Sequence, residues 1–203
     1  MSAETPPTVE RLRTLVGIWL VIITPQNEVF VVQNGKNRLA SQKVTGQLNC
    51  PAESYEEEDG GKFSNTIARA IREEVGRVIY DPNLTRPLAL IQLDNIPVPQ
   101  HVVAAPYLIP IEDKGWLTFD PQDRQESSNP QWVKLSDITD DVRLQIGPHN
   151  VPLFRSPMAA IAEVVRNAQS GKPYRAIRHV GISIKPEVYQ YLEANPAAQA
   201  FAA

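Results

Sequence analysis

Residues 64–76, SNTIARAIREEVG, are the stretch that decides the fold of this chain. Three apolar side chains recur in it at every fourth position, namely Ile67, Ile71 and Val75. This spacing predicts an amphipathic helix whose apolar stripe faces a core. Ser64 or Asn65 is expected to cap its start, because either side-chain oxygen can accept a free N–H of the first turn. Gly76 is expected to end it, since glycine enters the left-handed region without strain.

Two consecutive carboxylates, Glu73 and Glu74, are predicted to lie beside the apolar stripe, on the face shared with Ala70. One interpretation is a solvated helix face on which Arg69 pairs with Glu73 one turn away. The other is a pair of metal ligands. The helix by itself does not decide between them.

The segment 69–76, RAIREEVG, resembles the second half of the Nudix box, G-x5-E-x7-R-E-U-x-E-E-x-G-U, where U is an apolar residue. The positions that fit are Arg69, Ile71, Glu73, Glu74 and Gly76. The positions that depart are Ala70 and Gly61 in place of glutamates, Tyr55 in place of the first glycine and Arg77 in place of the last apolar residue. The resemblance implies an α/β fold, a Nudix-like α/β/α sandwich with a mixed sheet.

Apolar runs on both sides of the helix predict that sheet. Residues 16–24, VGIWLVIIT, are typical of a strand buried on both faces. Residues 28–33, EVFVVQ, follow a turn signal and predict the second strand of a hairpin. Further strands are expected at 43–49, 78–80, 87–93, 101–111 and 131–135. The prolines of 101–111 favour an edge strand or a strand end, and 131–135, QWVKL, resembles a late strand of Nudix domains that leads into a short helix.

A closing helix is predicted to begin at Ser156 and Pro157, with Ser156 as cap and Pro157 in the first turn. Its buried face is expected to consist of Met158, Ile161 and Val165. The predicted organisation is an N-terminal tail or short helix (1–15), a Nudix-like domain (16–171) and a C-terminal extension (172–203). The extension is expected to add a strand and a short helix that cover a sheet edge or mediate a homodimer.

Composition narrows the class of protein. Of the 203 residues, 42% are hydrophobic and 21% charged, and the net charge is −3, which is typical of a globular domain. Without a long basic run, neither nucleic acid nor a membrane surface is expected as the main partner. The chain has a single cysteine, Cys50, so no intrachain disulfide can form, and a cytoplasmic location is predicted. The longest apolar run, 15–23, is too short to span a bilayer.

The resemblance also implies a chemistry, namely hydrolysis of a phosphoanhydride bond in a nucleoside diphosphate linked to another moiety. Such a substrate is strongly anionic, so attack by water needs Mg²⁺ or Mn²⁺ to offset charge and to lower the pKa of the water. By the resemblance, Glu73 and Glu74 are the metal ligands, and Arg69 orients a carboxylate through a charge-assisted bond. Gly46 is expected to let the backbone approach the phosphates.

Ala70 leaves the expected carboxylate cluster one member short. Asp59 or Glu58, from the acidic loop 51–61 (PAESYEEEDGG), is one candidate replacement. Glu126, from the polar segment 114–130, is another. The alternative is a catalytically silent Nudix-like domain that binds a nucleotide-like ligand or another protein.

Overall fold

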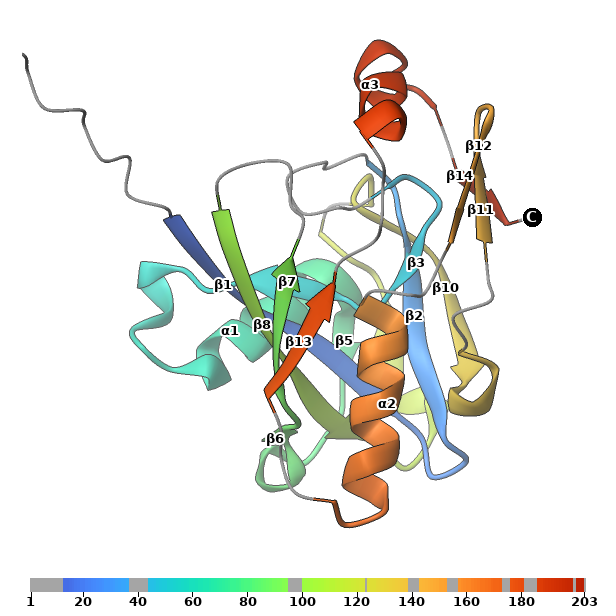
Figure 1. The fold of residues 1–203 in the computed structure, drawn as a ribbon. Coiled ribbons are helices and arrows are strands. Elements are labelled where there is room, and N and C mark those ends of the chain that lie inside the picture. The colour runs from blue at the N-terminus through green and yellow to red at the C-terminus, as the bar shows by residue number, and fades with distance from the viewer. Residues whose placement is uncertain are drawn as a thin grey trace, which may run out of the picture.

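The computed structural model describes residues 13–36, 44–94, 100–122, 124–138, 143–152, 157–172, 176–180, 186–198 and 200–202. A mixed sheet forms its centre, in the order β10-β2-β1-β8-β7-β13 (Figure 1). The strands are β1 (Arg13–Ile23), β2 (Glu28–Asn34), β7 (Leu90–Asp94), β8 (Gln100–Pro110), β10 (Ser127–Lys134) and β13 (Ala176–Val180). Short strands pair alongside this path: β3 (Leu48–Asn49) with β2, β4 (Ala52–Ser54) with β1, and β6 (Arg86–Pro87) with β8.

Strand β1 runs parallel to β8 along its whole length and supplies both faces of the core. Its alternate side chains point to opposite sides. Ile18, Leu20 and Ile22 pack in one apolar cluster with residues of helix α1 (Phe63–Ala70), while Trp19, Val21 and Ile23 pack in another with residues of helix α2 (Pro157–Gln169). The predicted buried strand and the α/β/α sandwich with a mixed sheet are therefore confirmed.

The predicted hairpin is confirmed, since β1 pairs antiparallel with β2 and Asn27 takes a positive φ of 59° in the turn between them. The sequence predicts the prolines of 101–111 in an edge strand or at a strand end; the edge position is wrong, whereas the strand end holds for Pro110, the last residue of β8. β8 lies between β1 and β7 inside the sheet. A proline lacks only the N–H donor, and the carbonyl of Pro106 still accepts a bond of 2.8 Å from the Leu88 amide.

The polar segment 114–130 is not one long loop. It contains a 3-10 turn (Lys114–Trp116) and strand β9 (Leu117–Phe119), and β10 begins at Ser127. β9 pairs with β5 (Gly76–Val78), which directly follows the helical segment. A three-residue strand is too short to show a period in the sequence.

The late tryptophan strand is confirmed. Trp132 on β10 meets the Phe30 ring edge-on at a centroid distance of 5.4 Å, and a 3-10 turn (Leu135–Asp137) follows. Other 3-10 turns span Glu57–Asp59 and Pro82–Leu84.

Helix α2 buries Met158, Ile161 and Val165 as predicted, and Gly171 follows it with φ 69°; Ser156 lies outside the described residues. Within segment 172–203, β13 pairs parallel with β7 and helix α3 spans Pro186–Ala194. A separate three-stranded sheet contains β12 (His149–Pro152), β11 (Arg143–Ile146) and β14 (Ala200–Ala202). None of the helices in the described ranges has the length and apolarity that crossing a bilayer requires.

Candidate functional site

The helical segment starts and ends differently from the prediction. α1 begins at Phe63 with Lys62 as its N-cap residue, so Ser64 and Asn65 lie inside the helix. After Ala70 the backbone widens into a π-helical turn, Ile71–Val75. Turns of this kind insert one extra residue and often occur at functional sites. They also rotate the side chains that follow, and Glu73 and Glu74 both lie in this turn.

Gly76 ends the turn at a tight contact with the backbone that follows β9. The amide of Asp120 donates 2.7 Å to the carbonyl of Val75, and the amide of Gln122 donates 2.9 Å to that of Glu73. Gly76 has φ 115°, and a Cβ atom there would lie 2.7 Å from the Asp120 nitrogen. The predicted glycine stop is confirmed, and it is also the point where β9 approaches the helical segment.

Arg69 is held by carboxylates from the acidic loop. Its guanidinium lies 3.0 Å from Asp59 and 3.3 Å from Glu53, with Glu56 and Glu73 both at 3.6 Å. It also donates to the carbonyl of Ser54. The expected pairing of Arg69 with Glu73 is present, and the role of Arg69 in orienting a carboxylate of a metal site stays a prediction. Asp59 and Arg69 hydrogen-bond directly, whereas Glu58, the other candidate from the same loop, is exposed.

Asp59 has a strongly lowered pKa, about 2. The main cause is the hydrogen bond from Arg69, followed by the one from the Glu56 amide. Burial acts in the opposite direction, and the Thr66 hydroxyl adds a further donor at 3.0 Å. The same hydrogen bond raises the pKa of Arg69 above its usual range. The pair stays charged throughout the physiological range.

This pair predicts a specific loss of stability in acid. The folded-state pKa of Asp59 is depressed from 3.8 to about 2. Its contribution to the free energy of unfolding is therefore present above pH 4 and is lost as the pH falls towards 2. Asp59→Asn should lack that part of the acid transition, whereas Glu58→Gln, an exposed change in the same loop, should keep the wild-type profile. Urea unfolding followed between pH 2 and pH 7 measures the difference. An unchanged profile in Asp59→Asn would contradict the assignment.

Glu74 does not lie on an exposed helix face, and the expectation of two outward carboxylates is wrong for it. Only 8% of the residue is exposed, and its Oε2 accepts a bond of 2.5 Å from the Ser127 hydroxyl on β10. Glu73 is one-third exposed and is shared by Arg69 and Arg72. The π-helical turn and the buried Glu74 separate the two carboxylates into different surroundings.

Buried polar side chains gather where Glu74 meets the sheet. Asn34 ends β2 on the face that also carries Val32 and packs towards α1. Ser127 is the β10 partner of Asn34, and Asn49 is the β3 partner of Val32, so both share this face. Gln47 accepts from the Asn34 amide at 3.4 Å. All of these except Val32 are buried polar groups, and we call Asn34, Gln47, Asn49, Glu74 and Ser127 the polar cluster.

One atom of the polar cluster has no hydrogen-bond partner among the described residues. The Oδ1 of Asn49 is fully buried and accepts no hydrogen bond from any residue in the described ranges. A buried polar atom without a partner costs free energy, and such an atom indicates an absent ligand, ion or water.

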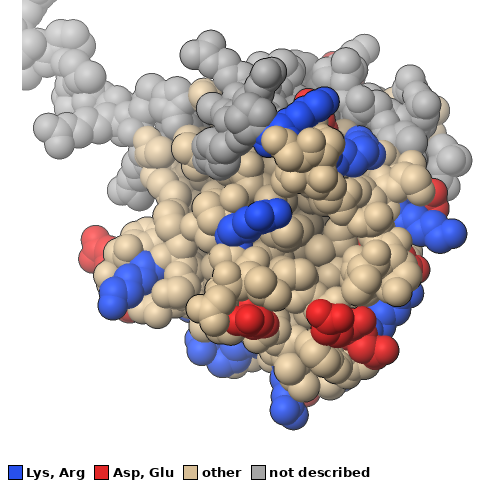
Figure 2. Space-filling model, turned by 90° about the horizontal axis from the view of Figure 1, so that it is seen from below, with Lys and Arg blue, Asp and Glu red and all other residues tan. Residues whose placement is uncertain are grey.

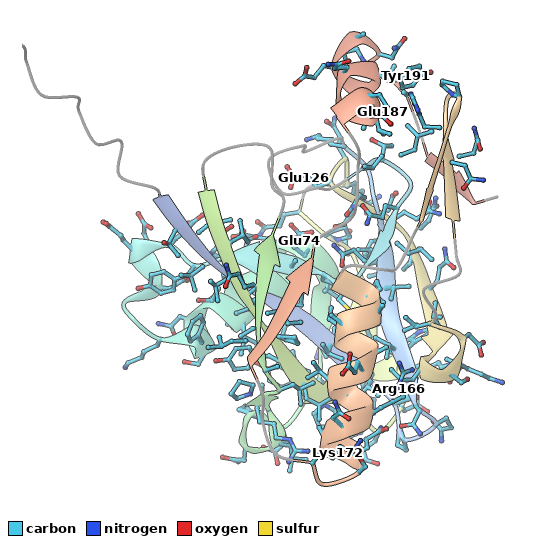
Figure 3. The ribbon with its side chains drawn as sticks, in the orientation of Figure 1. Glu74, Glu126, Arg166, Lys172, Glu187 and Tyr191 are labelled. Carbon is cyan, nitrogen blue, oxygen red and sulfur yellow. The ribbon has the colours of Figure 1, made fainter. Side chains whose placement is uncertain are left out.

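Gly46 and Glu126 lie near the polar cluster. Gly46 is in a turn with φ 85°, and its amide donates 2.7 Å to the carbonyl of Asn34. The strand predicted at 43–49 is therefore shorter, because β3 contains only Leu48–Asn49. Glu126 precedes Ser127 and lies at the same end of the sheet as Glu74 (Figure 3). Its carboxylate is 3.8 Å from Lys36.

The sequence reasoning missed four members of the polar cluster: Asn34, Gln47, Asn49 and Ser127. Asn34 precedes Gly35 in the sequence, and this Asn-Gly pair is only a weak sign because it is typical of any turn. Nothing in the sequence pointed to Ser127, because its partner Glu74 is 53 residues away.

The side chains as arranged do not fit the metal centre that the resemblance implies. Mg²⁺ prefers carboxylate oxygens together with retained waters. In the described ranges, no three Asp, Glu, His or Cys side chains are placed to hold one ion. Ala70 is completely buried in the apolar cluster beneath α1, and the carboxylate of Glu74 accepts a hydrogen bond from the Ser127 hydroxyl.

Solved structures resemble the fold of this chain. The NUDIX domain of Shewanella oneidensis NrtR, complexed with ADP ribose, has a TM-score of 0.54 and 16% identity, over 77% of this chain and 88% of its own. The MutT NUDIX hydrolase of Burkholderia pseudomallei has a TM-score of 0.53 and 15% identity, over 75% of this chain and 98% of its own. The chain has the Nudix fold.

A third Nudix-fold match is the MutT protein of Methanosarcina mazei, with a TM-score of 0.52 and 13% identity, over 80% of this chain and 99% of its own. No protein-family model and no curated protein matches the sequence. Identities this low establish the Nudix fold but transfer no residue roles.

Proposed function

We propose that this Nudix-fold protein binds a nucleoside diphosphate derivative beside Glu74 without hydrolysing it. The observation that carries the proposal is the polar cluster, in which the buried carboxylate of Glu74 accepts from the Ser127 hydroxyl and the side-chain oxygen of Asn49 has no partner among the described residues. Unpaired groups of this kind recognise ligands by hydrogen bonding. The NrtR domain complexed with ADP ribose supports the ligand class by analogy.

The alternative is the Mg²⁺- or Mn²⁺-dependent hydrolysis predicted from the box. The observation that favours it is the position of Glu126, which the Glu74–Ser127 hydrogen bond brings to the same end of the sheet as Glu74. Hydrolysis would require Glu73 to leave Arg69 and Arg72 and to turn towards Glu74.

The two functions predict opposite effects of Glu74→Gln. The variant keeps an acceptor for Ser127 but removes a negative charge. A binding site without metal should then hold anionic ADP-ribose as tightly as before or more tightly, by about two- to fivefold, because like-charge repulsion disappears. A hydrolase should instead show metal-dependent turnover in the wild type and lose nearly all of it in the variant.

Isothermal titration with ADP-ribose measures affinity, and chromatography of the incubated ligand with and without Mg²⁺ or Mn²⁺ measures cleavage. Ser127→Ala is the matched variant, since it keeps the charge of Glu74 and removes the hydrogen bond from the Ser127 hydroxyl. Nucleoside monophosphate released by the wild type only with metal would overturn the proposal in favour of hydrolysis. Absence of both binding and cleavage across nucleotide sugars, dinucleotides and triphosphates would exclude both functions.

A further inference from the structure

A cavity lies at the opposite end of β2 from the polar cluster. It has a volume of about 240 Å³ and lies where the parallel strands β1 and β8 end, at Ile23 and Pro110. The turn before β2 and the last turns of α2 complete its walls. Strand β2 runs from the cavity to the polar cluster. At about 3.3 Å per residue, its length separates the two places by roughly 20 Å. Ligands in α/β proteins often bind beyond the carboxyl ends of parallel strands.

The walls of this cavity are aliphatic and include Ile23, Leu108, Ile111, Val165 and Ala168. Such walls favour binding of a branched hydrocarbon side chain, because they remove it from water. The volume is below the ~300–1,000 Å³ of typical drug-sized pockets, so the cavity fits a molecule smaller than a nucleotide.

Charged side chains of both signs also line the cavity, together with the amides of Asn27 and Gln169. Arg86, on β6, and Glu112, just after β8, both line the cavity and both are exposed. Neither makes an ion pair with another residue of the described ranges. Figure 2 looks onto this end of the molecule, where acidic and basic side chains are interspersed and form no patch of one sign. A neutral pair of opposite charges favours a zwitterion over a polyanion such as a nucleoside diphosphate.

The lining contains another donor besides Arg86, namely the hydroxyl of the buried residue Thr24. The residue is 4% exposed, and its Oγ1 accepts from the Glu28 amide at 3.3 Å. A hydroxyl that accepts one bond can still donate its own hydrogen. The cavity thus offers two donors that suit a carboxylate, one carboxylate that suits an ammonium group, and aliphatic walls.

We propose that this cavity is a binding site for a free aliphatic amino acid, separate from the nucleotide site. The carboxylate of the amino acid lies against Arg86 and Thr24, its ammonium group against Glu112, and its side chain against the aliphatic walls. No bond is made or broken. The site is independent of whether the polar cluster binds or cleaves a nucleotide.

Titration calorimetry with L-leucine tests the site, using as probes the 2-oxo acid and the amine that carry the same side chain. We expect leucine to bind and each analogue to bind about tenfold more weakly, because each lacks one charge-assisted contact. Arg86→Gln and Glu112→Gln should each weaken leucine binding by about tenfold as well. The pairings predict that the 2-oxo acid is insensitive to Glu112→Gln and the amine to Arg86→Gln.

Arg77→Gln is the matched control, because Arg77 is an exposed arginine on β5 and does not line the cavity. It should leave the affinity for leucine unchanged, and so should Ser127→Ala in the polar cluster. Thermal unfolding of each variant without ligand verifies that all are folded. No heat and no thermal stabilisation of the wild type by millimolar leucine would overturn the proposal. Equal binding of the 2-oxo acid and leucine, or full affinity in Arg86→Gln, would overturn it too.

Discussion

Ala70→Glu, which restores the glutamate of the Nudix box, is expected to destabilise the protein by about 3–5 kcal/mol without creating metal-dependent hydrolysis. Ala70 has 0% of its surface exposed and packs in the cluster that contains Ile18, Leu20 and Phe30. A carboxylate introduced there would be removed from water without a partner. For a chain of this size the loss corresponds to a fall in Tm of roughly 10 °C.

Ala68→Glu is the control for this prediction, since Ala68 is an exposed position in the same helix. It should change the free energy of unfolding by no more than about 0.5 kcal/mol. Urea unfolding of Ala70→Glu and Ala68→Glu at pH 5 and pH 8 compares their free energies of unfolding at the two pH values. Burial raises the folded-state pKa of the introduced carboxyl, so its penalty should be smaller at pH 5 than at pH 8. Near-wild-type stability with new Mg²⁺-dependent turnover would show that position 70 can reach a catalytic site.

Gly76→Ala is expected to be the most damaging small substitution in the helical segment, with a loss of about 3–4 kcal/mol. Two costs combine at this position. A φ of 115° is unfavourable for any side chain. A Cβ atom would also lie 2.7 Å and 2.9 Å from backbone atoms of Asp120 and 2.9 Å from the Thr118 carbonyl oxygen. Backbone atoms in a paired strand cannot move aside as a side chain can.

Gly60→Ala separates the two costs. Gly60 has φ 62°, and nothing lies within 4 Å of the Cβ that would be added. It should therefore lose only about 1–2 kcal/mol, the cost of the left-handed conformation. Urea unfolding of both variants measures the difference. Equal losses would mean that β9 does not press on Gly76, and ADP-ribose affinity of Gly76→Ala would show whether this contact positions the turn that carries Glu74.

Much of the fold could be predicted because its signals are local. The run at 16–24 is apolar on both faces, and a strand of that composition is stable only between two layers, which it proves to be. The four-residue spacing of Ile67, Ile71 and Val75 likewise requires a helix with one buried side, and all three are buried. The spacing of Met158, Ile161 and Val165 predicted the buried face of α2 in the same way, and all three are buried.

The errors arose where tertiary contacts outweighed local preference. A π-helical turn was not visible in the spacing, and it places Glu74 against the sheet instead of beside Glu73 in water. Strand β9 is three residues long and exists through its pairing with β5. The prolines of β8 predicted an edge strand or a strand end because they lack a donor, yet Pro106 lies inside the sheet, where its carbonyl accepts a hydrogen bond.

The sequence by itself determined the layers of the Nudix fold and the residues that form its core, because burial of apolar side chains depends on periodicity that can be read along the chain. It also predicted the pairing of Arg69 with Glu73, which the structure contains. Only the tertiary structure decided the character of the site. Glu74 meets Ser127 across 53 residues, and Asn49 is left with an unpartnered oxygen through the pairing of β3 with β2. Such contacts depend on register and strand order, which leave no local trace in the sequence.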